Sequence, residues 1–226
     1  MFALAGAVAL VLAAGLVAAS LATGGDESAP VAETLEGSAE TAQLFQGIPQ
    51  RGTALGRADA PVTLAEYGDL QCPYCAAWAF DALPVLVQDY VRTGKLRIEF
   101  RGLTFIGPDS DRGLRAALAA GEQGKLWNVV DLLYRNQGHE NSGWLTDETL
   151  RRVAASVDGL DGERMLARSD AMTPGVQEAQ AFADASGING TPAFEVGPTG
   201  GRLARVQVSS LDADALRPAI EAALDQ

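Results

Sequence analysis

The chain has 226 residues, a length that suggests one large domain or two small ones. It is acidic, with 17 Lys and Arg residues against 29 Asp and Glu residues and a net charge of −12. The sequence holds no basic cluster for phosphates, which argues against a nucleic-acid-binding protein. Two cysteines and a single histidine, His139, are too few for a disulfide scaffold or a multi-histidine metal centre.

Residues 1–22 form an apolar segment without charge. As a helix it is long enough to cross a hydrocarbon core of about 30 Å. A cleavable signal peptide is usually shorter and has a basic start, which this segment lacks. We therefore expect a single-pass transmembrane anchor, with a cleaved signal peptide and secretion as the alternative. The first basic residue is Arg51, so no cluster of positive residues follows the apolar segment to keep the rest of the chain in the cytoplasm. We therefore expect that part of the chain to be extracytoplasmic.

Residues 23–56 are rich in small and polar residues, and we expect a flexible tether there. From residue 60 the composition changes from small and polar residues to stretches that favour strands and helices. Residues 61–67 predict a buried strand, and residues 76–92 predict a helix with a kink at Pro84. Residues 95–100 alternate polar and apolar side chains, which is typical of a half-buried strand.

A helical section follows, with apolar residues spaced three and four apart in segments 111–121, 125–136, 146–157 and 174–186. Strands are predicted at 193–196 and 202–208, joined by a glycine-rich turn, before a last helix at 212–224. The order of elements predicts an α/β domain over residues 57–226, whose sheet is interrupted by a helical insertion at about 102–187.

Both cysteines lie in one motif, Cys72-Pro73-Tyr74-Cys75. It follows a predicted strand and opens a predicted helix, where free N–H groups and the helix dipole stabilise a thiolate. We expect Cys72 to face solvent as the nucleophile and Cys75 to be buried one turn later, within reach of it. A zinc half-site, a structural disulfide and inert buried thiols are the alternatives, and each fits this spacing and position less well.

Three separated motifs carry a family resemblance. Residues 67–75 (YGDLQCPYC), 120–127 (AGEQGKLW) and 187–194 (GINGTPAF) resemble, in this order, segments of the DsbA-like thiol–disulfide oxidoreductases of the thioredoxin superfamily. The likeness is strongest to the BdbD-type branch. It implies a thioredoxin fold with an inserted helical domain, preceded here by the N-terminal membrane-anchor helix.

The resemblance also implies roles for particular residues. Cys72 is the expected nucleophile and Cys75 the resolving thiol. Pro192 is expected to follow a cis peptide bond, with Thr191 presenting backbone groups to the substrate beside Cys72. A proline that merely starts a strand is the alternative for Pro192.

Other candidate residues surround the motif. The resemblance implies that Glu66, six residues before Cys72, is a buried acid that exchanges protons with Cys75; a solvent-facing carboxylate is the alternative. Tyr74 and Trp78 are candidates for an apolar rim that contacts unfolded substrates, although Trp78 is equally suited to the core. His139 is expected on a loop.

The expected activity is dithiol–disulfide exchange, most simply as an oxidase that forms disulfides in exported proteins. The two thiols carry the electrons, so no cofactor is expected. Strongly oxidising family members have His where this chain has Tyr74, so we expect a moderate oxidant with a potential between about −120 and about −270 mV. A reductase or isomerase with glutaredoxin-like chemistry and a non-catalytic peptide-binding or chaperone module are the alternatives.

Two partners follow from this activity. The substrates are exported proteins with reduced cysteines, bound loosely through backbone and apolar contacts. By family analogy the enzyme is reoxidised by a membrane protein of the DsbB or vitamin-K-epoxide-reductase-like (VKOR-like) type.

Overall fold

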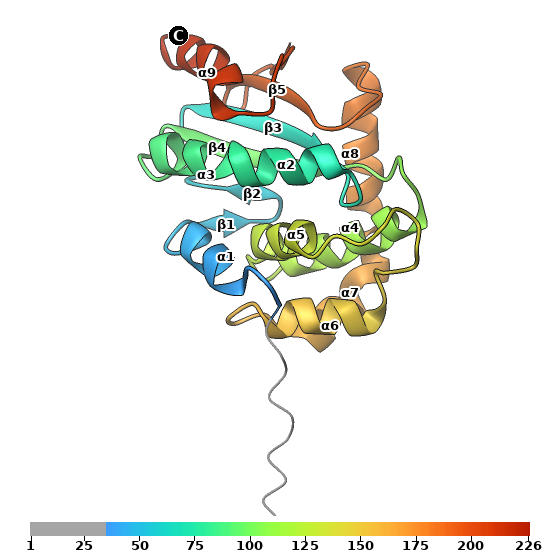
Figure 1. Cartoon of the computed structure of the whole chain (residues 1–226). Helices are drawn as coiled ribbons and strands as arrows, with labels where there is room; N and C mark the ends of the chain where they lie inside the picture. Colours follow the sequence, from blue (N-terminus) through green and yellow to red (C-terminus); the bar gives the residue numbers. More distant parts are fainter. Residues whose placement is uncertain (1–34) are drawn as a thin grey trace, which may run out of the picture. The chain divides into compact units, whose positions relative to one another are not determined.

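The computed structural model describes residues 35–226, which are built around a six-stranded sheet in the order β1-β2-β4-β3-β5-β6 (Figure 1). The central strand β3 runs parallel to β4 and antiparallel to β5. The expected strands are confirmed, with small shifts at their ends, and two short ones are added. The strands are β1 Gln50–Arg51, β2 Ala54–Leu55, β3 Val62–Gly68, β4 Leu96–Gly102, β5 Ala193–Pro198 and β6 Ala204–Val206.

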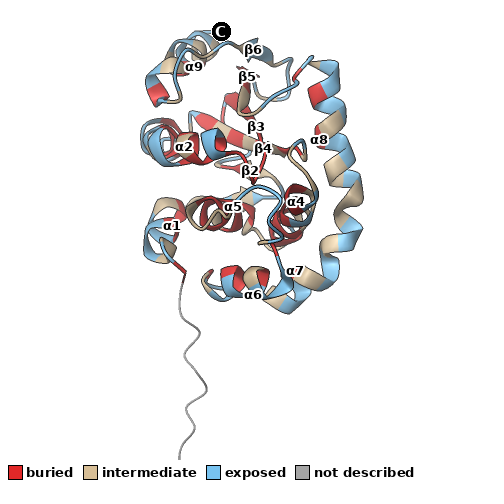
Figure 2. Cartoon of the chain, turned by 45° about the vertical axis from the view of Figure 1, so that its right-hand side comes forward, coloured by how far each residue is buried: buried red, intermediate tan, exposed pale blue. Residues whose placement is uncertain are grey.

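Strand β3 is buried along its whole length because helices cover both of its faces (Figure 2). Leu64 belongs to the main core, together with residues of α2 (Pro73–Asp81) and α5 (Leu126–Arg135). Ala65 and Tyr67 instead pack against α8 (Thr173–Ala185). Since successive side chains of a strand point to opposite faces, Glu66 shares the face of Leu64, toward α2.

The helix expected at 76–92 begins earlier and is broken. It starts as α2 at Pro73, because proline at the first helical position is pre-set for the helix and loses no hydrogen bond there. It breaks at Ala82 and continues as α3 (Leu83–Leu86) and a π-helical turn, Val87–Val91. Pro84 accounts for the break, since its ring and missing N–H disturb the preceding turn.

Five helices lie between β4 and β5, which confirms the helical insertion. The sequence pattern missed α7, because Met165 is its one buried residue and leaves little apolar periodicity. Thr146 caps α6, its hydroxyl accepting a hydrogen bond from the backbone of Thr149 at 3.1 Å. The helices are α4 Pro108–Gly121, α5 Leu126–Arg135, α6 Asp147–Ala155, α7 Gly162–Ser169 and α8 Thr173–Ala185. The chain ends with a short 3-10 turn and α9, Arg217–Leu224.

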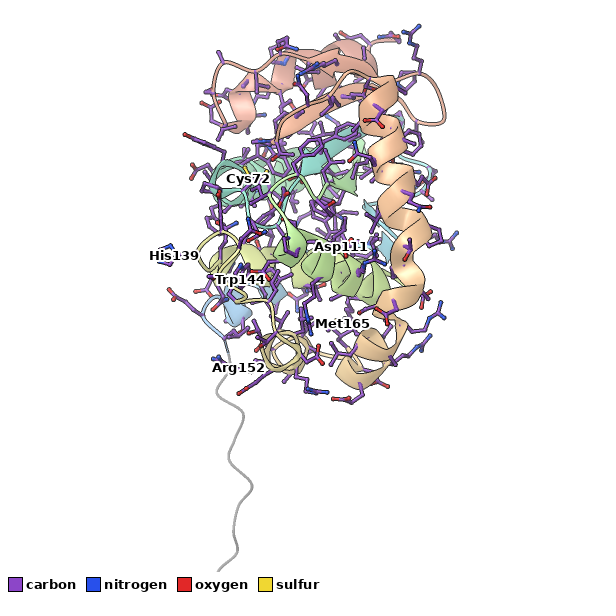
Figure 3. The ribbon with its side chains drawn as sticks, turned by 90° about the vertical axis from the view of Figure 1, so that its right-hand side faces the viewer. Cys72, Asp111, His139, Trp144, Arg152 and Met165 are labelled. Carbon is purple, nitrogen blue, oxygen red and sulfur yellow. The ribbon has the colours of Figure 1, made fainter. Side chains whose placement is uncertain are left out.

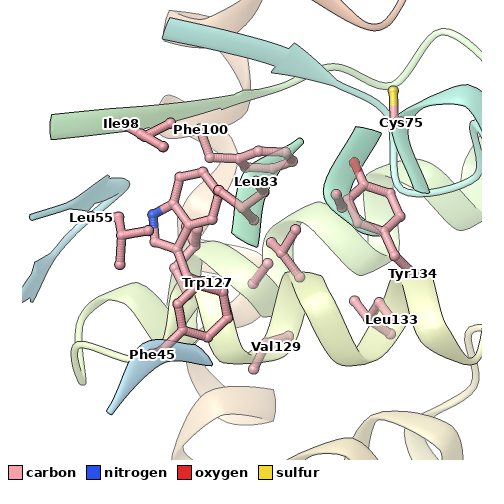
Figure 4. Packing of buried hydrophobic residues seen from close by; sticks show 14 of the residues in the cluster. Phe45, Leu55, Cys75, Leu83, Ile98, Phe100, Trp127, Val129, Leu133 and Tyr134 are labelled. Atoms are coloured by element: carbon pink, nitrogen blue, oxygen red, sulfur yellow. The ribbon is translucent and has the colours of Figure 1, made fainter. Parts of the chain in front are cut away.

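The prediction of a flexible tether at 23–56 is wrong for residues 35–56, the part that the structure describes. From residue 35 the chain is folded, with helix α1 (Ser38–Phe45) and the strands β1 and β2. Phe45 packs against Trp127 with ring centroids 6.4 Å apart, and the indole of Trp127 donates to the carbonyl of Thr53 at 3.0 Å (Figure 4). Because these partners are distant in sequence, the composition of residues 35–56 alone does not reveal that the segment is folded.

The expected anchor, residues 1–22, and the first part of the expected tether lie outside the described residues. Within residues 35–226, no helix has the length and apolar character that a membrane span requires.

Candidate active site

The two cysteines lie where β3 leads into α2. Cys72 is the capping residue, in an extended conformation, and Cys75 follows one turn later with its side chain fully buried. Both are free thiols. The position of the pair at a helix start is as the sequence predicted.

Cys72 is more covered than expected, since only 5% of its surface is exposed. The expectation of a solvent-facing sulfur is therefore wrong. Its thiol donates to the carbonyl oxygen of Thr191 at 3.5 Å, a contact between residues 119 positions apart. The Thr191–Pro192 peptide bond is cis, as the resemblance implied, and both residues are half-buried. The fold thus brings the two expected substrate-binding residues beside the expected nucleophile.

The two thiols differ in acidity. The pKa of Cys72 is lowered to about 6, first by the hydrogen bond with the Cys75 thiol and then by the side chain of Thr191 and the backbone N–H groups of Cys75 and Tyr74, against the effect of burial. Burial, above all, and the hydrogen bond with Cys72 raise the pKa of Cys75 well above its usual value. Near neutral pH, Cys72 is therefore mostly a thiolate while Cys75 keeps its proton, an arrangement that suits one nucleophile and one resolving thiol.

The thiolate of Cys72 is open to direct measurement. The ultraviolet absorbance of the reduced protein should titrate with a midpoint of about 6. Because this pKa lies below the ordinary thiol value, reduced protein should gain stability as the pH rises through the midpoint and lose it on acidification. Cys75→Ala, which removes the largest contribution, should move the midpoint upward; a midpoint near 9 in the unchanged protein would contradict the assignment.

Glu66 lies on β3 with its side chain 1% exposed, so the solvent-facing alternative is excluded. Neither carboxylate oxygen has a hydrogen-bond partner within residues 35–226. Burial, followed by the charge of Cys72, raises the pKa of Glu66 well above its usual value. The charge of Glu66 in turn raises the pKa of Cys75. Burial thus favours the protonated form of Glu66, which is electrostatically coupled to both thiols.

Of the two residues expected to form an apolar rim, one lies at the surface and the other in the core. Tyr74 is 66% exposed beside Cys72, in a position to contact a substrate. Trp78 is buried in the core, where its ring lies 5.3 Å from that of Phe194, so its role is packing. His139 lies on an exposed loop after α5 (Figure 3). Within the described part of the chain, no three His, Cys, Asp or Glu side chains are grouped to hold a metal ion.

A buried polar network that the sequence analysis missed holds the loop before the cysteines. Asp69 accepts hydrogen bonds from the backbone of Gln71 at 2.9 Å and from the hydroxyl of Ser110 at 2.6 Å. From the insertion, the side chain of Gln137 donates to the carbonyl of Cys72 at 3.3 Å. Asp69 and Gln71 belong to the resembling motif, but their partners lie far along the chain. The network fixes the backbone that carries the nucleophile.

Comparison with known proteins agrees with this geometry. A family model described as thioredoxin matches residues 50–218. Over 102 residues the chain is 39% identical to the probable disulfide bond formation protein D of Bacillus cereus, a match that covers 44% of this chain and 47% of that protein. The chain thus spans about half the length of this curated relative.

Two further similarities differ in kind. The crystal structure of oxidised BdbD from Bacillus subtilis shares the fold, with a TM-score of 0.66 at 23% identity, and the match covers 79% of this chain and 98% of that one. A stretch of 152 residues is 36% identical to the Na(+)/H(+) antiporter NhaA 1 of Salinispora arenicola and covers 66% of this chain but 22% of that protein. The family match shows that the chain belongs to the thioredoxin family, and within that family it is similar to disulfide bond formation protein D and shares the fold of BdbD.

Proposed function

We propose that the protein is an extracytoplasmic thiol–disulfide oxidoreductase that forms disulfide bonds in exported proteins. The observation that carries the proposal is the unequal acidity of the two thiols at the start of α2, with a pKa of about 6 at Cys72 and a strongly raised pKa at Cys75. A stabilised Cys72 thiolate favours the reduced enzyme, and an enzyme that favours its reduced form oxidises its substrates.

The reaction begins with the disulfide between Cys72 and Cys75. A substrate thiolate attacks the sulfur of Cys72, which forms a mixed disulfide and breaks the bond to Cys75. Cys75 leaves and must take up a proton, because its raised pKa makes it a poor thiolate leaving group. Buried Glu66, whose raised pKa favours its protonated form, is the acid that supplies this proton. A second substrate thiolate then attacks the substrate sulfur and releases Cys72 as a stable thiolate.

The substrate-binding surface in this proposal consists of Thr191 and Pro192 with exposed Tyr74 beside them. Backbone groups of Thr191 pair with an extended substrate chain, and Tyr74 adds apolar contact. Both interactions depend little on the substrate's sequence, which suits an enzyme that acts on many exported proteins.

The reduced enzyme must lose two electrons before the next turnover. We assign this step to a membrane protein of the DsbB or VKOR-like type, and we assign residues 1–22 to a single-pass anchor that keeps the domain at the membrane, with secretion after cleavage as the alternative. The names of curated relatives as disulfide bond formation proteins support an extracytoplasmic location for the catalytic domain.

The direction of exchange is decided by the reduction potential. The pKa of Cys72, about 6, lies between the values of about 3.5 in DsbA and about 7 in thioredoxin. We therefore expect a potential between about −120 and about −270 mV, measured by equilibrating the protein in glutathione buffers. A measured value at the thioredoxin end would contradict the oxidase assignment and favour the reductase alternative.

A further inference from the structure

Two buried side chains near the cysteines carry oxygens without partners. Tyr134, on α5, is 2% exposed, and neither its hydroxyl nor the carboxylate of Glu66 has a hydrogen-bond partner within residues 35–226. Polar groups in a protein interior are nearly always paired, because an unpaired one loses its hydrogen bonds to water without compensation. Two such groups from different elements therefore require an explanation.

The two groups converge on Gly68, the last residue of β3. A Cβ atom on Gly68 would lie 2.9 Å from the hydroxyl oxygen of Tyr134 and 3.0 Å from Oε1 of Glu66. The two oxygens can therefore be no farther apart than these two distances added together. A side chain at position 68 would displace both of them, so glycine keeps the space between the acid and the hydroxyl free.

The surroundings of Tyr134 are acidic. Its pKa is raised well above its usual value, first by burial and then by the charges of Cys75, Glu66, Asp69 and Cys72. Each of these groups becomes negative when it ionises. The hydroxyl therefore keeps its proton and is a hydrogen-bond donor held among acceptors. Figure 4 shows it pointing from α5 toward the sheet, on the side where Cys75 lies.

We propose that Tyr134 is a positioning residue for proton exchange between Glu66 and Cys75, its hydroxyl donating to the Glu66 carboxylate once that acid has given up its proton. The inference rests on the proposed function. As the Cys72–Cys75 bond breaks and the bond from Cys72 to the substrate forms, the proton of Glu66 passes to the sulfur of Cys75. The carboxylate left behind is buried, and the Tyr134 hydroxyl stabilises it without losing its own proton.

The test is Tyr134→Phe, which removes the hydroxyl and keeps the packing of the ring. In the reduced protein, the carboxyl carbon of Glu66 should titrate at higher pH in the variant, as followed by carbon-13 NMR. The single-turnover oxidation of a reduced peptide dithiol should slow by about tenfold, since a hydrogen bond to a charged group is lost. The rate should also change its pH dependence, which a packing defect alone does not produce.

Tyr67→Phe is the matched control. Tyr67 lies on the opposite face of β3, and its hydroxyl donates to Glu195 at 2.7 Å, so this variant also deletes a buried hydroxyl but leaves the Glu66 titration in place. An unchanged Glu66 titration in Tyr134→Phe, or equal effects of both variants, would overturn the inference. If the unchanged protein fails to oxidise thiols, the proposed function fails, while the NMR titration still decides the contact between Tyr134 and Glu66.

Discussion

Cys72→Ser should reduce the oxidation of a reduced substrate protein to the uncatalysed rate. A serine hydroxyl forms no disulfide, so neither the enzyme disulfide nor the mixed disulfide with the substrate can exist. Serine is close to cysteine in size and is well tolerated at the cap of a helix, where Cys72 lies. The measurement is the rate at which thiols disappear from a reduced, unfolded substrate, with circular dichroism to confirm that the variant is folded.

Cys75→Ala is the matched control, because it removes the other thiol and keeps the nucleophile. When the Cys72 thiolate of this variant attacks a disulfide in a substrate protein, one substrate sulfur leaves as a thiolate, and the mixed disulfide that forms should persist, since the resolving thiol is absent. The same variant can therefore trap substrates among exported proteins. Undiminished oxidation by Cys72→Ser would remove Cys72 from the mechanism. Absence of catalysis in the unchanged protein as well would favour the non-catalytic peptide-binding alternative, and catalysis of glutathione exchange by Cys75→Ala would favour glutaredoxin-like chemistry.

Glu66→Gln should slow the attack of substrate thiols on the enzyme disulfide by about 10²- to 10⁴-fold, the usual contribution of a positioned acid. Glutamine has nearly the same shape but supplies no acidic proton to Cys75, which would then leave as an unfavourable thiolate. The measurement is stopped-flow oxidation of a dithiol peptide by the disulfide form of the protein. Glu195→Gln is the control, since this carboxylate is also buried but lies on the opposite face of the sheet, paired with Arg101 at 3.1 Å.

The pH dependence of stability gives an independent readout of Glu66. Its pKa in the folded protein is raised above the value of the unfolded chain. The contribution of Glu66 to the stability of the folded protein is therefore largest at a pH below the pKa that it has in the unfolded chain. This contribution is lost as the pH rises toward the raised pKa of the folded protein. Glu66→Gln should abolish this loss in urea unfolding experiments. A variant with the same pH profile of stability and the same exchange rate would show that Glu66 is not the proton donor.

The sequence alone predicts the chemistry of the site better than its geometry. The spacing of the cysteines and their position after a strand are local features, so Cys72 and Cys75 are identified directly. The orientation of Glu66 is not, because β3 is buried on both faces and shows no alternation of polar and apolar residues. The coverage of Cys72 by Thr191 is likewise invisible, since the two residues meet only through the pairing of β3 with β5.

Contacts between residues that are distant in sequence also explain why elements outside the site were not predicted. Helix α1 and the strands β1 and β2 lie in a segment of small and polar residues, which by composition resembles a linker. Their stability comes from partners elsewhere in the chain, such as Trp127 packed on Phe45. Helix α7 was missed for a related reason, because a short helix with one buried residue has almost no apolar pattern.

The insertion between β4 and β5 contacts the segment around the cysteines at several places, among them Ser110 on Asp69, Gln137 on the backbone of Cys72 and Tyr134 near Gly68. The surroundings of the two sulfurs are therefore built from two stretches of chain that are separate in sequence. A chimera that keeps the thioredoxin portion and takes these helices from a relative should therefore differ from the parent protein in reduction potential. Substitutions in the helical insertion should likewise change the reactivity of the two thiols while the cysteine motif stays the same.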